Sequence, residues 1–182
     1  MTTYGKRLVA EAKETSYRLA RLSTRAKDEM LLAMAQALRE RRDFLLRENA
    51  KDLKQARSAK RTKSFLDRLT LHEERIDEMS DCLRDIAGLP DPVGTVIRGW
   101  RRPNELEISK VRVPLGVILI VYEARPNVTS DCAGLCLKSS NAAILRGGSD
   151  SIHSNRAIGR VLLEAARRAG VAFQPFFIVE KT

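Results

Sequence analysis

The fold is decided by residues 113–155, which read VPLGVILIVYEARPNVTSDCAGLCLKSSNAAILRGGSDSIHSN. The run Gly116–Tyr122 is short, apolar and rich in β-branched residues, which is typical of a strand buried on both faces. Val128–Lys138 then carries apolar residues at helical spacing. A second apolar run, Ala142–Leu145, precedes a helical pattern that reaches Ala169. This order of strand, helix, strand and helix predicts an α/β fold with a parallel sheet and a right-handed crossover.

A polar turn follows each of these strands, at Glu123–Asn127 and at Arg146–Ser149. Both turns are expected at the carboxyl edge of the sheet, where parallel sheets bind ligands. The first turn lacks the glycine-rich dinucleotide motif. The second places an arginine and a glycine pair before a helix that Ser149 and Asp150 can cap, which suits a phosphate. An arginine here also suits a ribose 2′-phosphate, which favours NADP over NAD. The alternative is an ordinary tight turn with a surface arginine.

The stretch resembles the gamma-glutamyl phosphate reductase family, NADPH-dependent enzymes of proline biosynthesis in the aldehyde dehydrogenase superfamily. The resemblance is carried by YEARPNVT at 122–129 and ILRGG at 144–148, and it extends upstream through YRLA, NAKD and DPVG to nearly the whole chain. Ser140 departs from the pattern, because the family has glycine in that turn, and a positive φ there would strain a serine. Family members are much longer, and the missing part carries their catalytic cysteine.

The resemblance implies an aldehyde dehydrogenase-like fold, with N-terminal helices, part of a Rossmann-like parallel sheet and a β-hairpin. It divides the chain into a helical part of the cofactor domain (1–92), an oligomerisation hairpin (93–112) and a truncated NADP-binding portion (113–182), with the catalytic domain absent. The implied reaction is the NADPH-dependent reduction of L-glutamyl 5-phosphate to L-glutamate 5-semialdehyde and phosphate. The implied protein is a cytoplasmic homo-oligomer with glutamate 5-kinase as a further partner. The isolated chain is expected to be inactive.

By the same resemblance, Asn127 is the catalytic candidate, because it matches an asparagine whose side-chain amide helps to hold the reacting oxyanion. The N-cap of Val128–Lys138 is the competing role for this side chain. Arg146 matches the position of the superfamily lysine that contacts the adenosine ribose, and its guanidinium can grip a 2′-phosphate. The other candidates for cofactor binding are Glu123, Arg125, Gly147, Gly148 and Ser149.

The cysteines and histidines predict neither a nucleophile nor a metal site. Cys132 and Cys136 lie four residues apart beside apolar residues, and Cys82 also lies on an apolar helix face, so buried, inert thiols are expected. A metal site needs three or four ligands, and His72 and His153 lie at no ligand spacing from the cysteines. The odd number of cysteines fits a reducing cytoplasm.

Composition argues against nucleic acid and membrane as partners. Lys and Arg number 33 against 23 Asp and Glu, and the resulting net charge of +10 could indicate a nucleic-acid binder. However, acidic residues are interleaved with the basic ones, and aromatic residues make up only 5% of the chain, so few rings can stack on bases. No apolar run approaches the ~20 residues of a membrane span. A non-catalytic, truncated paralogue that pairs with full-length subunits through Gly94–Val113 remains the alternative function.

The rest of the chain predicts helices and a hairpin around the central stretch. A third parallel strand is expected at Phe176–Val179, and its position at the end of the chain suggests truncation. Lys138 is expected to be a solvated helix end. The remaining predicted elements are helices at Tyr4–Leu22, at Thr24–Arg42 after an N-cap at Ser23, with helical character continuing to about Arg57, at Phe65–Leu69 and at His72–Ala87, and hairpin strands at Gly94–Gly99 and Leu106–Val113 around a Trp100–Glu105 turn.

Overall fold

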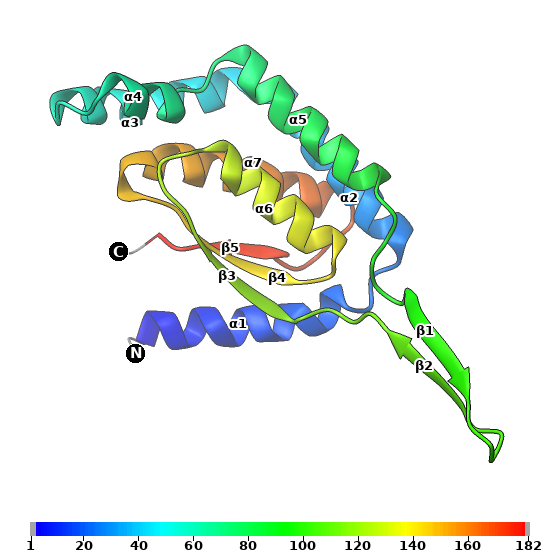
Figure 1. Ribbon diagram of the computed structural model, residues 1–182. Helices are drawn as coiled ribbons and strands as arrows, with labels where there is room; N and C mark the ends of the chain where they lie inside the picture. The colour runs from blue at the N-terminus through cyan, green and yellow to red at the C-terminus, as the bar shows by residue number, and fades with distance from the viewer. Residues whose placement is uncertain (1–2, 181–182) are drawn as a thin grey trace.

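A computed structural model describes residues 3–180 and shows a layered α/β body from which a hairpin projects (Figure 1). The helices are α1 (Thr3–Leu19), α2 (Thr24–Glu40), α3 (Arg42–Ser58), α4 (Lys63–Leu69), α5 (Glu73–Gly88), α6 (Asn127–Lys138), the 3₁₀ turn η1 (Ser149–Ser151) and α7 (Ile152–Arg168). The strands are β1 (Val96–Arg101), β2 (Glu107–Val111), β3 (Val117–Val121), β4 (Ala142–Arg146) and β5 (Phe176–Ile178). The α/β class and the hairpin are therefore confirmed.

The sheet of the body is parallel, as predicted, and its order in the described chain is β3-β4-β5. Val117 pairs with Ala142 at one end of β3, and Val121 pairs with Arg146 at the other. Helix α1 lies against one face of the sheet, and α6 and α7 lie against the other (Figure 1). Helices α2, α3 and α5 form an outer layer over α6 and α7. This layering places the ends of β3 and β4, with the turns that follow them, at one edge of the body.

The core is formed by the apolar faces of α2, α5 and α7 and by β4. Met30, Met34 and Leu38 of α2 are buried, as their helical spacing predicts. The same cluster of buried residues contains Ala142–Leu145, so the helices of the first 92 residues share one core with the sheet. The division of the chain into three parts therefore stays a prediction. In the described chain, no helix is long and apolar enough to cross a membrane.

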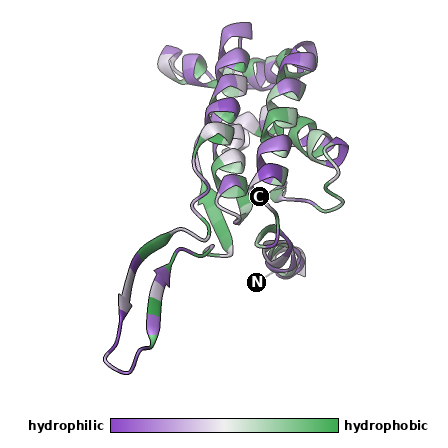
Figure 2. Cartoon of the chain, turned by 90° about the vertical axis from the view of Figure 1, so that its right-hand side faces the viewer, coloured by the Kyte–Doolittle hydropathy of each residue, from purple (hydrophilic) through white to green (hydrophobic). Residues whose placement is uncertain are grey.

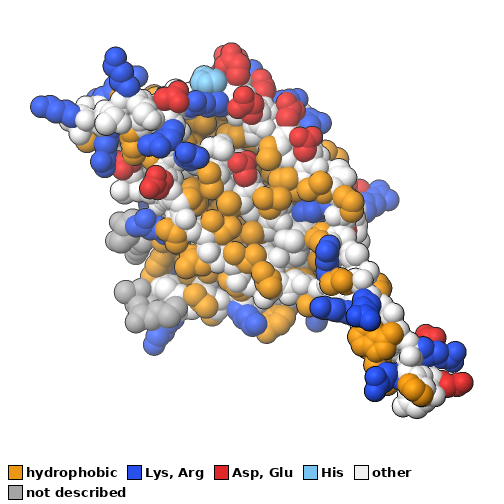
Figure 3. Space-filling view, in the orientation of Figure 1, with side chains coloured by type: hydrophobic (Ala, Val, Ile, Leu, Met, Phe, Trp, Pro, Cys, Tyr) orange, Lys and Arg blue, Asp and Glu red, His pale blue; other side chains and the backbone are white. Residues whose placement is uncertain are grey.

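Strand β3 differs from the expectation of a strand buried on both faces. Leu119 and Val121 are 62% and 64% exposed. The reason is that β3 lies at one side of the described sheet, and one of its faces is left uncovered by the residues that the structure describes. Figure 3 shows hydrophobic side chains gathered on this side of the molecule, over β3 and α6.

The hairpin is confirmed, but its turn lies further along the chain than predicted. Trp100 belongs to β1 and pairs with Ile108, so the prediction that it begins the turn is wrong. The turn is closed by a hydrogen bond from Arg102 N to Leu106 O at 2.9 Å, with Glu105 at a φ of +68°. Every residue of β1 is exposed, and Figure 2 shows the hairpin extending away from the body with hydrophobic and hydrophilic residues in alternation.

Lys138 is buried rather than solvated, which corrects the expectation for the end of α6. Its side chain is 4% exposed, and Nζ lies 2.6 Å from Asp28 Oδ1. Nζ also donates a hydrogen bond to the carbonyl oxygen of Ala87 at 2.7 Å. Because α6 packs between α5 and β4, its last turn ends inside the helical layer, where the ammonium group needs these partners.

The N-caps are confirmed for α2 but not for the helix after β4. Ser23 accepts a hydrogen bond from Ala26 N, as predicted. Ser149 and Asp150 were expected to cap the helix that ends at Ala169, but they lie in η1, and α7 begins at Ile152. Asp150 instead pairs with Arg61 from the segment after α3, at 3.0 Å. This long-range ion pair takes the carboxylate away from the backbone of its own helix.

Candidate functional site

The two predicted ligand turns lie against each other at the edge of the sheet. Tyr122 N donates a hydrogen bond to Arg146 O at 3.1 Å, which continues the register of β3 and β4 into the turns. A Cβ atom on Gly148 would lie 3.4 Å from Ala124 N and 3.5 Å from Glu123 C. The backbones of the two turns are therefore in contact, and a side chain at Gly148 would stand between them.

A chain of buried hydrogen bonds fixes both turns to α6 and α7. Tyr122 Oη lies 2.7 Å from Thr129 Oγ1, and Thr129 Oγ1 donates to Asn155 Oδ1 at 3.1 Å. Asn155 Nδ2 donates to Ser151 Oγ at 3.0 Å, and Ser151 Oγ donates to Gly148 O at 3.1 Å. Burial raises the pKa of Tyr122 to about 12, so this hydroxyl stays protonated at physiological pH. Such a connected network holds the turns rigidly.

Gly147 is required by this network. A Cβ atom on Gly147 would lie 2.1 Å from Asn155 Nδ2 and 3.0 Å from Tyr122 Cε2. Both neighbours are held by their own hydrogen bonds, so neither can move away without breaking the chain of contacts. Glycine at this position therefore lets the turn after β4 pack directly on the side chains that support it.

The N-terminus of α7 is capped by a carboxylate from a distant helix. Asp52 of α3 accepts hydrogen bonds from His153 N at 3.1 Å, from Ser154 N at 2.7 Å and from Ser154 Oγ at 2.6 Å. Burial raises the pKa of Asp52, while the hydrogen bonds from Ser154 and His153 oppose this shift. The amide groups at the start of α7 are thus already satisfied, so an anion at the second turn depends on Arg146 and the glycine backbone.

The charged candidates of the two turns are open to solvent. Glu123 and Arg125 are exposed, and Arg146 is half-buried at the end of β4. Among the residues that the structure describes, no hydrogen bond or ion pair engages the guanidinium groups of Arg125 and Arg146. Both cations are therefore available to an anionic ligand.

Asn127 is the first residue of α6 and does not cap it, so the predicted N-cap role is wrong. Pro126 occupies the N-cap position and already has helical φ and ψ angles of −56° and −36°, which places Asn127 inside the first turn. The exposed side chain of Asn127 donates from Nδ2 to Asp131 Oδ2 at 3.1 Å. Burial raises the pKa of Asp131, although the hydrogen bonds from Asn127 and Ser130 oppose this effect.

A cavity of about 370 Å³ lies beside Asn127. One wall is formed by residues of α4, of α5 and of the turn between them, and the other by Arg125, Pro126, Asn127 and Asp131. Sequence reasoning placed Arg125 and Asn127 at a ligand site but missed the wall from α4 and α5. No local pattern could indicate it, because residues 68–82 reach the site only through tertiary packing.

The thiols of this chain are poor nucleophiles. Burial raises the pKa of Cys82 and of Cys132, and the charge of Asp131 adds to both shifts. Burial also raises the pKa of Cys136 to about 11. A raised pKa lowers the thiolate fraction at neutral pH, which agrees with the expectation that these cysteines are inert. Within residues 3–180, no group of three His, Cys, Asp or Glu side chains is placed to hold a metal ion.

Known proteins similar to this chain carry the name gamma-glutamyl phosphate reductase. No family model matches the chain. The protein of that name from Geobacter metallireducens is 53% identical over 164 residues, which are 90% of this chain and 39% of the relative. The one from Moorella thermoacetica is 52% identical over 171 residues, covering 94% of this chain and 41% of the relative. The chain thus spans about two fifths of the length of the curated relatives that it matches.

Solved structures agree with the sequence comparison. The gamma-glutamyl phosphate reductase of Thermotoga maritima has a TM-score of 0.93 and 40% identity, over 97% of this chain and 42% of that chain. The Saccharomyces cerevisiae enzyme has a TM-score of 0.93 and 27% identity, over 100% of this chain and 47% of that chain. A probable aldehyde dehydrogenase from Listeria monocytogenes, at 17% identity and a TM-score of 0.67, shares the fold over 96% of this chain and 36% of that chain. The aldehyde dehydrogenase-like fold is therefore confirmed.

Proposed function

We propose that this chain, which corresponds in sequence and fold to a portion of the gamma-glutamyl phosphate reductases, supplies the cofactor-binding part of such an enzyme. The proposed reaction is the NADPH-dependent reduction of L-glutamyl 5-phosphate to L-glutamate 5-semialdehyde and phosphate. The observation that carries the proposal is the contact between the turns after β3 and β4, where Arg146, beside the Gly147–Gly148 pair, has no side-chain partner among the described residues. Ligands of parallel sheets bind at this edge.

The residues of the two turns suit a 2′-phosphorylated nicotinamide dinucleotide. The cofactor, when bound, would supply the hydride. Arg146 would pair with the 2′-phosphate through its planar guanidinium, which matches a phosphate better than a lysine does. Gly147 and Gly148 would let the ligand approach the backbone, and Glu123 and Ser149 would complete the polar surface around it. The chain of hydrogen bonds that joins Tyr122 to Gly148 through the side chains of Thr129, Asn155 and Ser151 keeps this surface preformed. Arg125, the remaining cofactor candidate, lines the cavity beside Asn127, so its side chain is assigned to the substrate instead.

Asn127 would act on the substrate rather than on the cofactor. Its Nδ2 group donates to Asp131 and is exposed beside the cavity, so Asp131 orients the amide. A preoriented amide N–H can stabilise the negative charge that develops on a carbonyl oxygen during attack. In this proposal, Asn127 is the catalytic residue of the chain, and Asp131 is its positioning residue.

The nucleophile of the proposed reaction is not among the residues described here. Acyl-phosphate reduction through a covalent intermediate needs a thiolate, and burial raises the pKa of all three cysteines. The purified chain, mixed with NADPH and L-glutamyl 5-phosphate, is therefore expected not to oxidise NADPH, so the absorbance of the reduced cofactor should stay unchanged. Oxidation of NADPH that depends on the substrate and is lost in a Cys82→Ala, Cys132→Ala or Cys136→Ala variant would contradict this assignment.

A second proposed role is assembly through the hairpin. Every residue of β1 is exposed, and the apolar side chains of Val96, Ile97 and Trp100 are 57%, 51% and 42% exposed. A protruding hairpin with such an edge is a template for pairing with another chain. We propose that it forms the interface of a homo-oligomer. The alternative, a non-catalytic paralogue that pairs with full-length subunits, would use the same surface, and mass measurement of mixed complexes distinguishes the two.

The proposed setting is the cytoplasm, with glutamate 5-kinase as a further partner. All three cysteines are unpaired in the described chain, which fits a reducing compartment. The kinase is the class of enzyme that would make the acyl phosphate. Co-purification of the kinase with the tagged chain, set against a tag-only control, tests this partner.

A further inference from the structure

The cavity beside Asn127, between α4–α5 and the start of α6, contains charged groups of both signs that the fold itself does not pair. Arg68 and Arg125 line it from opposite walls, and no hydrogen bond or ion pair engages either guanidinium within residues 3–180. Glu78 lines it from α5 and is likewise without a partner among these residues. Two cations and one carboxylate are thus left open around one small space.

The other charged groups of the cavity are already engaged. Arg75 donates to Thr70 O at 2.7 Å and to Asp67 Oδ1 at 3.2 Å, so it braces the turn between α4 and α5. Asp131 accepts the amide of Asn127 at 3.1 Å. These contacts fix the walls and leave Arg68, Arg125 and Glu78 as the groups that a ligand would meet.

We propose that this cavity binds the amino-acid end of the substrate, with Arg68 and Arg125 pairing with the α-carboxylate and Glu78 with the α-ammonium group. The inference rests on the proposed function, because it places the head group of that reaction's substrate. Guanidinium groups bind carboxylates in paired hydrogen bonds, and a carboxylate is the natural partner of an ammonium ion. The substrate's side chain then extends towards Asn127, which holds the oxygen of its reacting carbonyl.

The size of the cavity agrees with this occupant. Its volume of about 370 Å³ lies near the lower end of the range for small-molecule sites, roughly 300–1,000 Å³. The charge pattern also defines what the site rejects. An N-acylated or deaminated analogue keeps the carboxylate but leaves Glu78 without an ammonium partner, and an unpaired charge of this kind weakens binding.

The test follows the backbone amides of the ¹⁵N-labelled chain by NMR during titration with L-glutamate. We expect shifts at Thr70, Cys82 and Asn127, which line the cavity on both walls. Glutarate and N-acetyl-L-glutamate are expected to bind at least about ten-fold more weakly, which corresponds to about 1.4 kcal/mol. Equal binding of glutarate would contradict the ammonium contact, and tighter binding of inorganic phosphate at the same amides would assign the cavity to a phosphoryl group instead.

Variants separate the two halves of the head group. Arg68→Gln and Arg125→Gln are expected to weaken L-glutamate and glutarate alike, whereas Glu78→Gln should weaken only L-glutamate and so make the two ligands equal. Arg84→Gln is the matched control, because Arg84 lies on α5 outside the cavity and contacts Gln36 at 3.5 Å. Unchanged L-glutamate binding in all three cavity variants, with amide spectra that remain folded, would overturn the proposal.

A parallel titration with NADPH keeps this inference distinct from the proposed function. NADPH is expected to shift the amides of Gly147 and Ser149 rather than those of Thr70 and Cys82. Binding of L-glutamate without any response to NADPH would contradict the cofactor role and leave the amino-acid site standing. A response to NADPH without any response to L-glutamate would do the reverse.

Discussion

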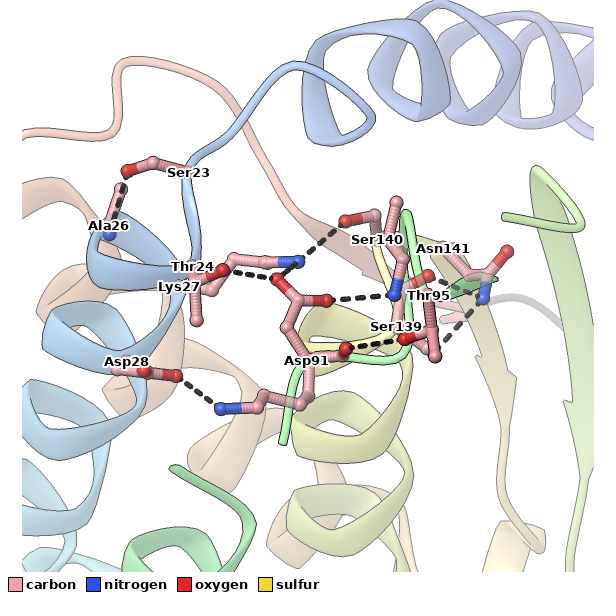
Figure 4. A network of polar contacts seen from close by, with 12 residues as sticks. Ser23, Thr24, Ala26, Lys27, Asp28, Asp91, Thr95, Ser139, Ser140 and Asn141 are labelled. Atoms are coloured by element: carbon pink, nitrogen blue, oxygen red, sulfur yellow. Dashed lines mark hydrogen bonds and ion pairs between the residues drawn. The ribbon is translucent and has the colours of Figure 1, made fainter. Parts of the chain in front are cut away.

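Lys27 and Asp91 form a buried ion pair, with Nζ 2.5 Å from Oδ2, at the point where the hairpin leaves the body (Figure 4). The side chain of Lys27 is only 1% exposed. Nζ also donates to Ser140 Oγ at 3.1 Å, and Thr24 Oγ1 donates to Asp91 Oδ2 at 2.7 Å. The pair therefore ties α2 to the segment before β1 and to the turn before β4.

Replacement of Asp91 by Asn is expected to lower the free energy of unfolding by about 3–5 kcal/mol, because it leaves the charge of Lys27 buried without a counter-ion. Urea denaturation at pH 7 measures the change. Asp85→Asn, at an exposed position on α5, is the matched control and should fall within about 0.5 kcal/mol of the parent. A similar small effect for Asp91→Asn would show that the pair contributes nothing.

The difference in stability between the parent and the Asp91→Asn variant should depend on pH. Burial favours the neutral form of Asp91, but hydrogen bonds from Lys27 and Thr24 and the charge of Lys27 outweigh it and hold the pKa of this carboxyl below its ordinary value. The contribution to stability is thus present above the unfolded pKa of about 3.9 and is lost as the pH falls through the folded value. Urea midpoints of parent and variant should converge from pH 5 towards pH 2, whereas a constant gap would contradict the linkage.

Ser140 has a left-handed φ of +57°, and its hydroxyl accepts the hydrogen bond from Lys27. Ser140→Ala keeps the strain and removes the acceptor, so we expect a loss of about 1–3 kcal/mol. Ser140→Gly also removes the acceptor but relieves the strain, which recovers about 1 kcal/mol. Thermal and urea denaturation of both variants check the order, and a glycine variant less stable than the alanine variant would contradict it.

Gly147 and Gly148 should respond differently to alanine. A Cβ on Gly147 would lie 2.1 Å from Asn155 Nδ2, whereas a Cβ on Gly148 would meet Ala124 N at 3.4 Å. Gly147→Ala is expected to cost about 1–3 kcal/mol of stability through overpacking and to disturb the Asn155 amide in NMR spectra. Gly148→Ala is expected to leave stability within about 0.5 kcal/mol of the parent and to weaken cofactor binding. Equal stabilities of the two variants would argue against the buried network.

The exposed hairpin should control association and not folding. Trp100→Glu places a charge on the protruding edge, so we expect a shift towards a smaller species in sedimentation experiments, with an unchanged melting temperature. Tyr17→Glu, at an exposed aromatic residue on α1, is the control, because Tyr17 is 53% exposed and belongs to α1 rather than to the hairpin. Association that persists in Trp100→Glu but is lost in the control would place the interface elsewhere.

The elements of this fold could be predicted from sequence where a local pattern determines them. The apolar runs at 117–121 and 142–145 predicted the parallel strands, and Ser23 predicted an N-cap, because these signals lie within a few residues of the structure that they specify. The burial of Lys138 could not be predicted, because its partners Asp28 and Ala87 lie 110 and 51 residues away.

The candidate site could likewise be predicted only where local sequence patterns determine it. The motifs identified the two turns, and the structure places them in contact, but the supports of those turns come from long-range packing. Asp52 caps a helix 101 residues further along the chain, and Thr129 binds Asn155 across 26 residues. The N-cap of Val128–Lys138 was the alternative role for Asn127, but Pro126 occupies the N-cap position, and α6 begins at Asn127, one residue earlier than expected. Such a shift depends on tertiary geometry that residue types alone do not encode.

The most direct test of the central claim is the ratio of the NADPH and NADH dissociation constants, measured by titration calorimetry for the parent chain and for Arg146→Gln. Arg160→Gln, which removes an exposed α7 arginine paired with Glu164, serves as the control. The account predicts at least about a ten-fold preference for NADPH in the parent and in the control, and no preference in Arg146→Gln. A preference for NADPH that survives in Arg146→Gln, or its absence in the parent, would contradict the assignment of the turn after β4 to the 2′-phosphate.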